Sequence, residues 1–274
     1  GRGEEDGGSM IPYQFTYHRP KTLAEAEKLF SADAKFLAGG QTLIPTMKMR
    51  LANPSALIDI SGLPELSFIR AGSDAIVIGA GTKHFDVANS ADVKRMIPAL
   101  AYTAEQIGDP AVRYMGTLGG SLANNDPAAD YPAAALGLGA SIKTTKRTIA
   151  ADDFFTGMFS TALNDGEIVT EVSFPVPERA GYAKFPNPAS RYAMAGVFVA
   201  KTKTGVRVAV TGAAPCVFRV PEMEAALAKN FSADAIAKIT VPAADMNSDI
   251  HGSAEYRAHL VTVMAKRAVQ AALK

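Results

Sequence analysis

The sequence is poor in cysteine, in paired histidines and in charge of one sign, and each scarcity removes a class of protein. Cys216 is the one cysteine in 274 residues, so the chain can form no internal disulfide and hold no iron–sulfur cluster by itself. No histidine lies near it, and a small buried hydrophobe is its expected role. The four histidines are scattered, and we expect no metal bound by this chain alone.

A charge excess and long hydrophobic runs are also missing. The chain carries 28 Lys+Arg against 27 Asp+Glu, a formal net charge of +1, and therefore lacks the basic footprint of a nucleic-acid-binding protein. No stretch approaches the roughly 18 consecutive apolar residues of a membrane span, and no signal-peptide pattern opens the sequence. With 48% hydrophobic and 20% charged residues, the composition predicts a folded cytoplasmic protein.

The first part of the chain predicts a small mixed α/β unit. Residues 1–9 lack an apolar period and are interpreted as a cloning scar or a disordered arm. A T-x-x-E capping box at Thr22 predicts a helix over 22–30. Short apolar runs bounded by turn residues predict strands at 35–38, 56–60 and 75–78.

The middle of the chain changes from helical periodicity to a broken pattern. Between 86 and 107 the apolar spacing is helical, with Pro98 suited to a first helical position and Gly108 placed to end a helix. The glycine- and proline-containing segment 114–140 predicts a series of tight turns. Strand patterns return over 140–144 and 167–174.

The last third predicts a separate α+β module. Pro175-Val176-Pro177 breaks the chain, and we place a module boundary there. Alternating runs predict an antiparallel hairpin over 191–200 and 206–211, turned at Thr204-Gly205. Helices predicted at about 221–229 and 253–273 would cover one face of its sheet. The second carries an apolar stripe of Leu260, Met264, Ala268 and Ala271.

Two glycine-centred segments are candidates for binding an anion. Residues 36–43 read as a strand running into Gly39-Gly40, and residues 116–127 contain Gly119-Gly120. A Gly-Gly pair permits positive φ and lets successive backbone N–H groups converge on a phosphate oxygen. Further donors are the side chains of Gln41, Thr42, Thr117 and Ser121. Together the segments could grip a pyrophosphate, although each alone is equally compatible with an ordinary tight turn.

The established phosphate and nucleophile motifs are absent. There is no G-x-x-x-x-G-K-[ST] sequence, and the nearest dinucleotide pattern, residues 79–84, has His84 in place of the third glycine. The segment around Ser121 also departs from the G-x-S-x-G elbow of serine hydrolases. These absences disfavour a Rossmann domain, a P-loop nucleotidase and a serine hydrolase.

Taken together, the two segments resemble a known family. Residues 37–45 with 49–51, and residues 117–124 with 126–130, are similar to the FAD-binding medium subunits of molybdenum hydroxylases, the relatives of carbon monoxide dehydrogenase and xanthine dehydrogenase. The resemblance covers Met10 to Lys274 and is strongest to the carbon monoxide dehydrogenase type. Further matching motifs are Met10-Ile11-Pro12, Arg113, Gly166-Glu167-Ile168-Val169, Lys184-Phe185, Arg191-Tyr192 and residues 249–257.

The resemblance implies an α+β fold with two parts. The first is a two-subdomain FAD-binding unit of the vanillyl-alcohol-oxidase/PCMH type, and the second is a C-terminal α+β domain with an antiparallel sheet and helices. The implied bounds are 10–62 and 63–178 for the two subdomains and 179–274 for the C-terminal domain.

The resemblance also implies roles for individual residues. The first segment would wrap the FAD pyrophosphate with backbone N–H groups, and the second would close over it. Asp130 would accept a hydrogen bond from a cofactor hydroxyl, and Val169 would pack against the flavin edge. Lys184 would lie near the isoalloxazine or pyrophosphate, and Tyr192 would cover one flavin face. The segments comprise Phe36, Leu37, Ala38, Gly39, Gly40, Gln41, Thr42 and Leu43, and Thr117, Leu118, Gly119, Gly120 and Ser121.

Residue types alone leave plainer interpretations open. Asp130 could stabilise a turn, Lys184 could be a solvated lysine at a strand end, and Tyr192 could belong to the core. Gln41 departs from the residues that relatives often show, which leaves the backbone grip intact and a side-chain contact open. Valine at Gly40 or Gly119 should abolish FAD binding by blocking the approach of the pyrophosphate.

The resemblance implies that the chain is one of three different subunits of a heterotrimer and that two heterotrimers form a dimer. Each subunit would carry out one part of the reaction. A large subunit would oxidise substrate at a molybdenum cofactor, and a small subunit would relay electrons through [2Fe–2S] clusters. This chain's FAD would pass them to an external acceptor, so no catalytic residue is needed here. Two alternatives remain: a self-contained flavin oxidase, whose substrate reduces the flavin directly, and a non-redox assembly subunit, which stays colourless with FAD.

Overall fold

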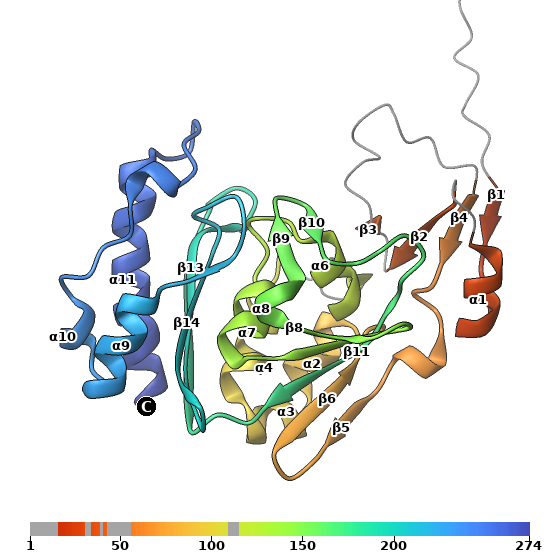
Figure 1. Ribbon diagram of the computed structural model, residues 1–274, viewed down its shortest axis with the longest axis horizontal. Coiled ribbons are helices and arrows are strands. Elements are labelled where there is room, and N and C mark those ends of the chain that lie inside the picture. The colour runs from red at the N-terminus through yellow and green to blue at the C-terminus, as the bar shows by residue number, and fades with distance from the viewer. Residues whose placement is uncertain (1–15, 31–33, 39–40, 43–55, 109–114) are drawn as a thin grey trace, which may run out of the picture.

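Three β-sheets of four or five strands follow one another along the described part of the chain in the computed structural model (Figure 1). The structure describes residues 16–30, 34–38, 41–42, 56–108 and 115–274. A small hairpin of β9 (Phe155–Gly157) and β10 (Ser160–Thr161) forms a separate two-stranded sheet. No helix in these ranges is both long and apolar enough to cross a membrane.

The N-terminal sheet has the order β1-β4-β2-β3. The β1–β4 and β4–β2 pairs are parallel, whereas β2 and β3 form an antiparallel hairpin. The Thr22 hydroxyl accepts a 3.1 Å hydrogen bond from the Glu25 N–H and caps α1, so the predicted helix start is confirmed. The elements are β1 (Thr16–His18), α1 (Leu23–Leu29), β2 (Ala34–Ala38), β3 (Gln41–Thr42) and β4 (Ala56–Asp59).

The central sheet is antiparallel throughout, in the order β5-β6-β11-β7-β8. Its strands are β5 (Ile69–Ala71), β6 (Ala75–Gly79), β7 (Ser141–Thr144), β8 (Thr148–Ala150) and β11 (Val169–Pro175), preceded by the 3-10 helix η2 (Pro64–Leu66). Its helices are α2 (His84–Asn89), α3 (Ala91–Met96), α4 (Pro98–Glu105), α6 (Leu118–Asn124), α7 (Tyr131–Leu138) and α8 (Ala151–Phe154).

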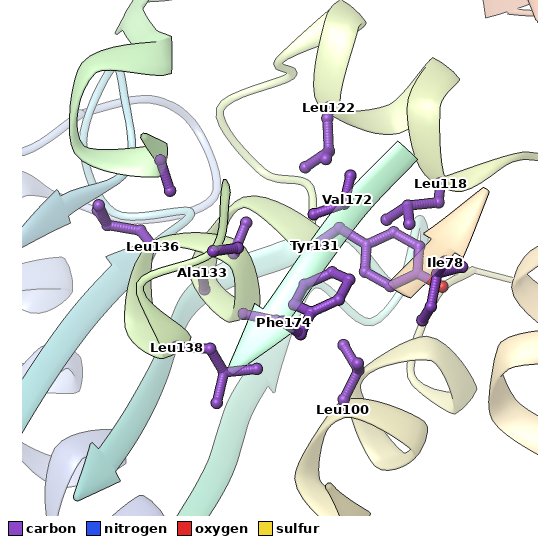
Figure 2. Packing of buried hydrophobic residues seen from close by; sticks show 14 of the residues in the cluster. Ile78, Leu100, Leu118, Leu122, Tyr131, Ala133, Leu136, Leu138, Val172 and Phe174 are labelled. Carbon is purple, nitrogen blue, oxygen red and sulfur yellow. The ribbon is translucent and has the colours of Figure 1, made fainter. Parts of the chain in front are cut away.

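The core of this central unit lies between the sheet and its helices. In Figure 2 the rings of Tyr131 from α7 and Phe174 from β11 lie among side chains of Ile78, Leu100 and Leu118. All five are 1% exposed or less. Complete burial of one such side chain stabilises the fold by about 1.5–3 kcal/mol, so this cluster fixes α7 on the sheet.

The prediction of tight turns over 114–140 is wrong, because α6 and α7 occupy most of it. The glycines there allow close packing: a Cβ at Gly119 would lie 2.6 Å from the Ala80 Cβ. One at Gly137 would lie 2.6 Å from the ring of Phe198. Tertiary contact therefore overrides the low helix propensity of glycine.

The C-terminal sheet is antiparallel, in the order β12-β13-β14-β15. Helices α9 to α11 lie on one side of it in Figure 1, and α4 and α7 of the central unit pack against the same sheet. Its elements are β12 (Arg179–Pro186), β13 (Ala193–Thr202), β14 (Gly205–Thr211), β15 (Phe218–Arg219), α9 (Pro221–Lys229), α10 (Ala233–Ile236), η3 (Ala243–Asp245) and α11 (Ala254–Ala272).

The predicted hairpin and both helices of this module are confirmed, with two corrections. The hairpin turns at Lys203-Thr204 and not at Thr204-Gly205, because Gly205 already pairs with Thr202 as the first residue of β14. The other correction concerns the apolar stripe of α11. Leu260, Met264 and Ala268 are buried as expected. Ala271 is exposed, and Ala272 takes the buried position at the end of the stripe.

Candidate functional site

The structure brings the two glycine-centred segments next to each other. Helix α6 contacts both β2 and β3, the strands that flank Gly39-Gly40 (Figure 1). Gly39, Gly40 and Leu43 lie outside the described residues, and so do the side chains of Ala38, Gln41 and Thr42.

Two predicted residues of the first segment have structural roles on β2. Phe36 is buried and its ring stacks on Phe30, with the centroids 5.4 Å apart. The Leu37 carbonyl accepts a 2.9 Å hydrogen bond from the Ile60 N–H. The Phe36 side chain is therefore part of the N-terminal core.

The second segment forms the start of α6. The Thr117 hydroxyl accepts a 3.1 Å hydrogen bond from the Gly120 N–H, and the Thr117 carbonyl accepts one of 3.0 Å from Ser121. The Leu118 N–H donates to the Thr82 carbonyl at 3.0 Å, and the Gly119 N–H donates to Ala80 at 2.8 Å. The first four N–H groups of the helix thus have partners within the chain. Ala80 covers the side of Gly119 on which a Cβ would stand, so a ligand here would contact the remaining exposed backbone of Gly119 and Gly120.

Two cavities border different faces of α6. The first extends from Gly119 and Gly120 towards the N-terminal unit, and the buried Val169 lies in its wall. Its lining residues are Ile60, Ser61, Leu66, Ala80, Gly81, Thr117, Gly119, Gly120, Ala123, Leu163, Glu167 and Val169. The second has a volume of about 200 Å³ and is lined by His84, Ile107, Gly108, Ser121, Asn124, Asp126, Ala129, Asp130, Ser190, Arg191 and Tyr192.

A buried carboxylate, Glu167, lies beside the first cavity. It accepts hydrogen bonds from Arg147 at 3.0 and 3.1 Å, from the Thr144 hydroxyl at 2.6 Å and from the Asn164 N–H at 2.9 Å. Burial alone would raise its pKa, but these hydrogen bonds outweigh it and lower the pKa to about 2. Glu167 is therefore ionised at neutral pH and ties β7 to the start of β11.

A second buried carboxylate, Asp130, lies at the second cavity. It accepts hydrogen bonds from the Tyr182 hydroxyl at 2.6 Å and from the Lys184 ammonium at 3.1 Å, and Lys184 also donates to the Gln106 carbonyl at 2.9 Å. The Asp130 and Lys184 side chains are 5% and 4% exposed. Burial raises the pKa of Asp130, against the opposing effect of Lys184.

These contacts remove the plainer interpretations of two residues. Lys184 is not a solvated lysine, because its ammonium is buried against Asp130. Tyr192 is not a core residue: it lies just before β13, is 47% exposed and lines the second cavity. Partial burial, with Asp126 and Asp130 nearby, raises the pKa of Tyr192 and keeps its hydroxyl protonated.

The loop that carries Asp130 is anchored by the C-terminal sheet. The Thr211 hydroxyl donates to the Ala129 carbonyl at 2.6 Å. The Gly212 N–H donates to Pro127 at 2.8 Å, and the Ala193 N–H donates to Ala128 at 3.2 Å. The second cavity is thus built jointly by the central and C-terminal units.

Sequence reasoning gave no role to His84, which lines the second cavity. Its side chain is 1% exposed, and its ring lies 5.0 Å from that of Tyr131. Neither the Nδ1 atom of His84 nor the Tyr131 hydroxyl has a hydrogen-bond partner among the described residues. Burial and the charge of Lys83 lower the pKa of His84 to about 3, so the imidazole is neutral. The histidine in place of the third glycine at 79–84 was the available signal.

Asn125, at the end of α6, was also assigned no role. It is buried with φ 45°, and its amide donates at 2.9 Å to the carbonyls of Gly157 and Ser160. The side chain thereby fixes the β9–β10 hairpin against α6. An Asn-Asn-Asp-Pro sequence signals such a left-handed turn, because asparagine tolerates positive φ.

The residues lining the two cavities fit a ligand that has both apolar and polar parts. Apolar walls and glycine surface line the first cavity, while amide, hydroxyl and charged groups line the second. The Nδ1 atom of the neutral His84 is a buried polar atom beside the second cavity, and it has no partner among the described residues. Such a combination suits a ligand with a planar ring system at one end of a polar chain.

Comparison with known proteins agrees with this reading. Residues 13–177 match the model of the FAD binding domain in molybdopterin dehydrogenase, and residues 182–272 match the CO dehydrogenase flavoprotein C-terminal domain. The carbon monoxide dehydrogenase medium chain of Hydrogenophaga pseudoflava is 36% identical, with 96% of this chain and 98% of the relative covered.

Two further matches bear on fold and specificity. The nicotine 6-hydroxylase medium subunit of Paenarthrobacter nicotinovorans is also 36% identical, with 92% of this chain and 95% of the relative covered. The structure of reconstituted CO dehydrogenase from Oligotropha carboxidovorans aligns with a TM-score of 0.84 and 35% identity, covering 96% of this chain and 99% of that one. The resemblance, the α+β fold class and the FAD cofactor expected from the sequence are confirmed. The chain belongs to the family of molybdopterin dehydrogenase flavoproteins and is an FAD-binding oxidoreductase subunit of a multi-subunit complex.

Proposed function

We propose that this chain receives electrons from an iron–sulfur subunit, collects them on FAD and passes them to an external acceptor, while a molybdenum-cofactor subunit oxidises the substrate. The observation that carries the proposal is the position of α6, which contacts the β2–β3 hairpin and borders both cavities. A dimer of heterotrimers working in the cytoplasm completes the proposal.

The residues near α6 have separate proposed roles towards FAD. The segment 36–43 and residues 117–121 would hold the pyrophosphate, and Val169 would pack against the flavin from the wall of the first cavity. Tyr192, with its exposed ring at the second cavity, would cover one flavin face and limit access of water. Bound FAD supplies the redox chemistry, since it exchanges electrons singly or in pairs.

Asp130 and Lys184 have a proposed positioning role as well as a cofactor contact. Because Lys184 bonds both Asp130 and the Gln106 carbonyl, it fixes the carboxylate between α4 and α7. Asp130 lines the second cavity, and each of its oxygens already accepts one hydrogen bond, Oδ1 from Tyr182 and Oδ2 from Lys184. A remaining lone pair of this carboxylate would accept from a cofactor hydroxyl. Lys184 would then act on FAD through Asp130.

The domain bounds of 10–62, 63–178 and 179–274 are likewise proposed. Among the residues that the structure describes, each of these three domain ranges contains one of the three larger sheets. We propose that a partner subunit selects the substrate. The medium subunits of a carbon monoxide enzyme and of a nicotine enzyme have the same sequence identity to this chain, 36%, although their substrates differ.

The visible absorption spectrum of the purified chain, before and after addition of FAD, tests this function. We expect flavin bands, release of FAD on heating, and reduction by the iron–sulfur partner. Tyr192→Ala should alter flavin absorption or fluorescence, whereas Tyr102→Ala is a matched control because that tyrosine is 45% exposed and lines neither cavity. A chain that stays colourless even with its partners would favour the assembly subunit, and reduction of the isolated flavin by a simple substrate would favour the oxidase.

A further inference from the structure

His84 is a buried polar side chain whose hydrogen-bonding capacity the fold leaves partly unused. The side chain is 1% exposed, and its Nδ1 atom has no hydrogen-bond partner among the described residues. A buried polar atom without a partner lowers stability, and most such atoms in proteins therefore have one. His84 also lines the second cavity, so a ligand in that cavity could reach the imidazole.

The backbone around His84 fixes this residue relative to α6. His84 is the first residue of α2, and its N–H donates to the Gly116 carbonyl at 3.1 Å. The residue before it, Lys83, pairs with Thr117 in an antiparallel bridge. Thr117 is the N-cap of α6, so the start of α2 is held beside the start of the helix that borders both cavities.

Packing against Tyr131 fixes the imidazole ring as well. The two ring centroids are 5.0 Å apart, with an interplanar angle of 60°. Tyr131 is 1% exposed and belongs to the core between the central sheet and its helices (Figure 2). Its hydroxyl also lacks a partner among the described residues, but Tyr131 lines neither the first nor the second cavity. The two neighbours therefore differ in their access to a ligand.

The charge state of His84 limits the groups that it can bind. Burial, assisted by the charge of Lys83, lowers the pKa of His84 to about 3, so the imidazole is uncharged at neutral pH. A neutral imidazole has one N–H donor and one acceptor nitrogen, and it lacks the positive charge that attracts a phosphate. Its suitable partner is therefore an uncharged hydroxyl, carbonyl or ring N–H group.

We propose that His84 binds the flavin half of FAD through a hydrogen bond to an uncharged polar group in the second cavity. This inference rests on the proposed function, in which Tyr192 covers one flavin face at the same cavity. It adds a cofactor contact from α2, an element to which the family resemblance gave no role. It also accounts for a polar side chain at a position that is otherwise enclosed by the core.

Two variants with side chains of the same shape test this contact. Leucine and asparagine both branch at Cγ, but only the asparagine amide can replace a hydrogen bond of the imidazole. FAD is titrated into the full chain after removal of flavin, and flavin fluorescence gives the Kd. His84→Leu should raise the Kd for FAD about tenfold, as expected for one lost hydrogen bond. His84→Asn should recover most of the affinity. The Kd for ADP, which lacks the flavin half, should be the same in His84→Leu and in the unmodified chain.

Tyr131→Phe is the matched control, because it removes the neighbouring unpartnered hydroxyl from a residue that lines neither of these two cavities. Its Kd for FAD should equal that of the unmodified chain. Urea unfolding of the flavin-free chain supplies a second readout. His84→Leu should leave the midpoint unchanged or raise it, since it removes a buried polar atom without a partner.

The outcomes separate this inference from the proposed function. An unchanged Kd for FAD in His84→Leu would overturn the contact while the proposed function stands. A lower unfolding midpoint of flavin-free His84→Leu would also overturn it, because His84 would then serve the fold. A parallel loss of ADP affinity would overturn the assignment to the flavin half. If the unmodified chain holds no FAD even with its partner subunits, the proposed function itself fails.

Discussion

Asp130 and Glu167 are both buried carboxylates at cavities beside α6, yet their surroundings differ. Glu167 receives hydrogen bonds from Arg147, Thr144 and Asn164, and its pKa falls to about 2. Asp130 receives two hydrogen bonds, from Tyr182 and Lys184, and burial raises its pKa. Several donors outweigh desolvation at Glu167, whereas the charge of Asp130 depends on one ammonium group. The charged form of Glu167 is therefore stabilised by several groups, whereas the charged form of Asp130 depends mainly on Lys184.

The largest effect is expected from removing that partner. Lys184→Met leaves the Asp130 carboxylate buried without a cation and should lower the free energy of unfolding by about 3–5 kcal/mol. Urea denaturation measures the change. The double variant Asp130→Asn/Lys184→Met should recover most of the loss, because the amide carries no charge. A loss below about 1 kcal/mol in Lys184→Met would contradict the difference drawn between the two carboxylates.

The next largest loss of stability is expected at Gly119, in the wall of the first cavity. Gly119→Ala places a Cβ 2.6 Å from the Ala80 Cβ and 3.0 Å from its carbonyl oxygen, so α6 must shift. We expect a loss of about 2–3 kcal/mol, measured by thermal and urea unfolding, from this overpacking. Gly62→Ala is the control, since nothing lies within 4 Å of its added Cβ. Equal stability of the two variants would show that the contact with Ala80 relaxes freely.

The two carboxylates should also differ in the sign of their pH dependence. The pKa of Glu167 falls from 4.5 to about 2 on folding, so its contribution is present above pH 4.5 and is lost as the pH falls towards 2. We expect about 1–2 kcal/mol, because Arg147 is 43% exposed and screened by water. Glu167→Gln should flatten this acid limb in unfolding curves between pH 5 and 2. Asp130, with a raised pKa, contributes in the opposite direction.

The smallest effect on stability is expected at Tyr192, which lines the second cavity. Tyr192→Phe removes a hydroxyl from a half-exposed ring and should change the free energy of unfolding by less than about 0.5 kcal/mol. Flavin fluorescence of the same sample measures the effect on bound FAD. A large loss of stability would mean that Tyr192 supports the fold.

The elements with local signals were predictable from sequence. Thr22 and Pro98 each begin a helix at the expected position, because capping and fixed φ act within a few residues. Helix α6 was missed because Gly119 and Gly120 weaken the helical pattern. Gly119 is needed there because it packs against Ala80, 39 residues earlier in the chain.

The candidate site was predictable only in part. The family resemblance predicted Asp130, Lys184 and Tyr192 as cofactor-binding residues. No sequence pattern near Lys184 indicates that it bonds Asp130, which lies 54 residues away. The anchoring of the Asp130 loop by Thr211 is likewise a long-range contact. Such pairings arise from topology, which residue patterns along one strand or helix do not contain.

The anchoring of that loop also sets an order of events during synthesis. Pro127, Ala128 and Ala129 receive their hydrogen bonds from Gly212, Ala193 and Thr211, which leave the ribosome more than sixty residues later. The Asp130 side of the pocket is therefore completed only after β14 has emerged and paired. If FAD binds in this pocket as proposed, its loading would follow late in folding, and a chain stalled before Thr211 would present the N-terminal segments without a finished pocket.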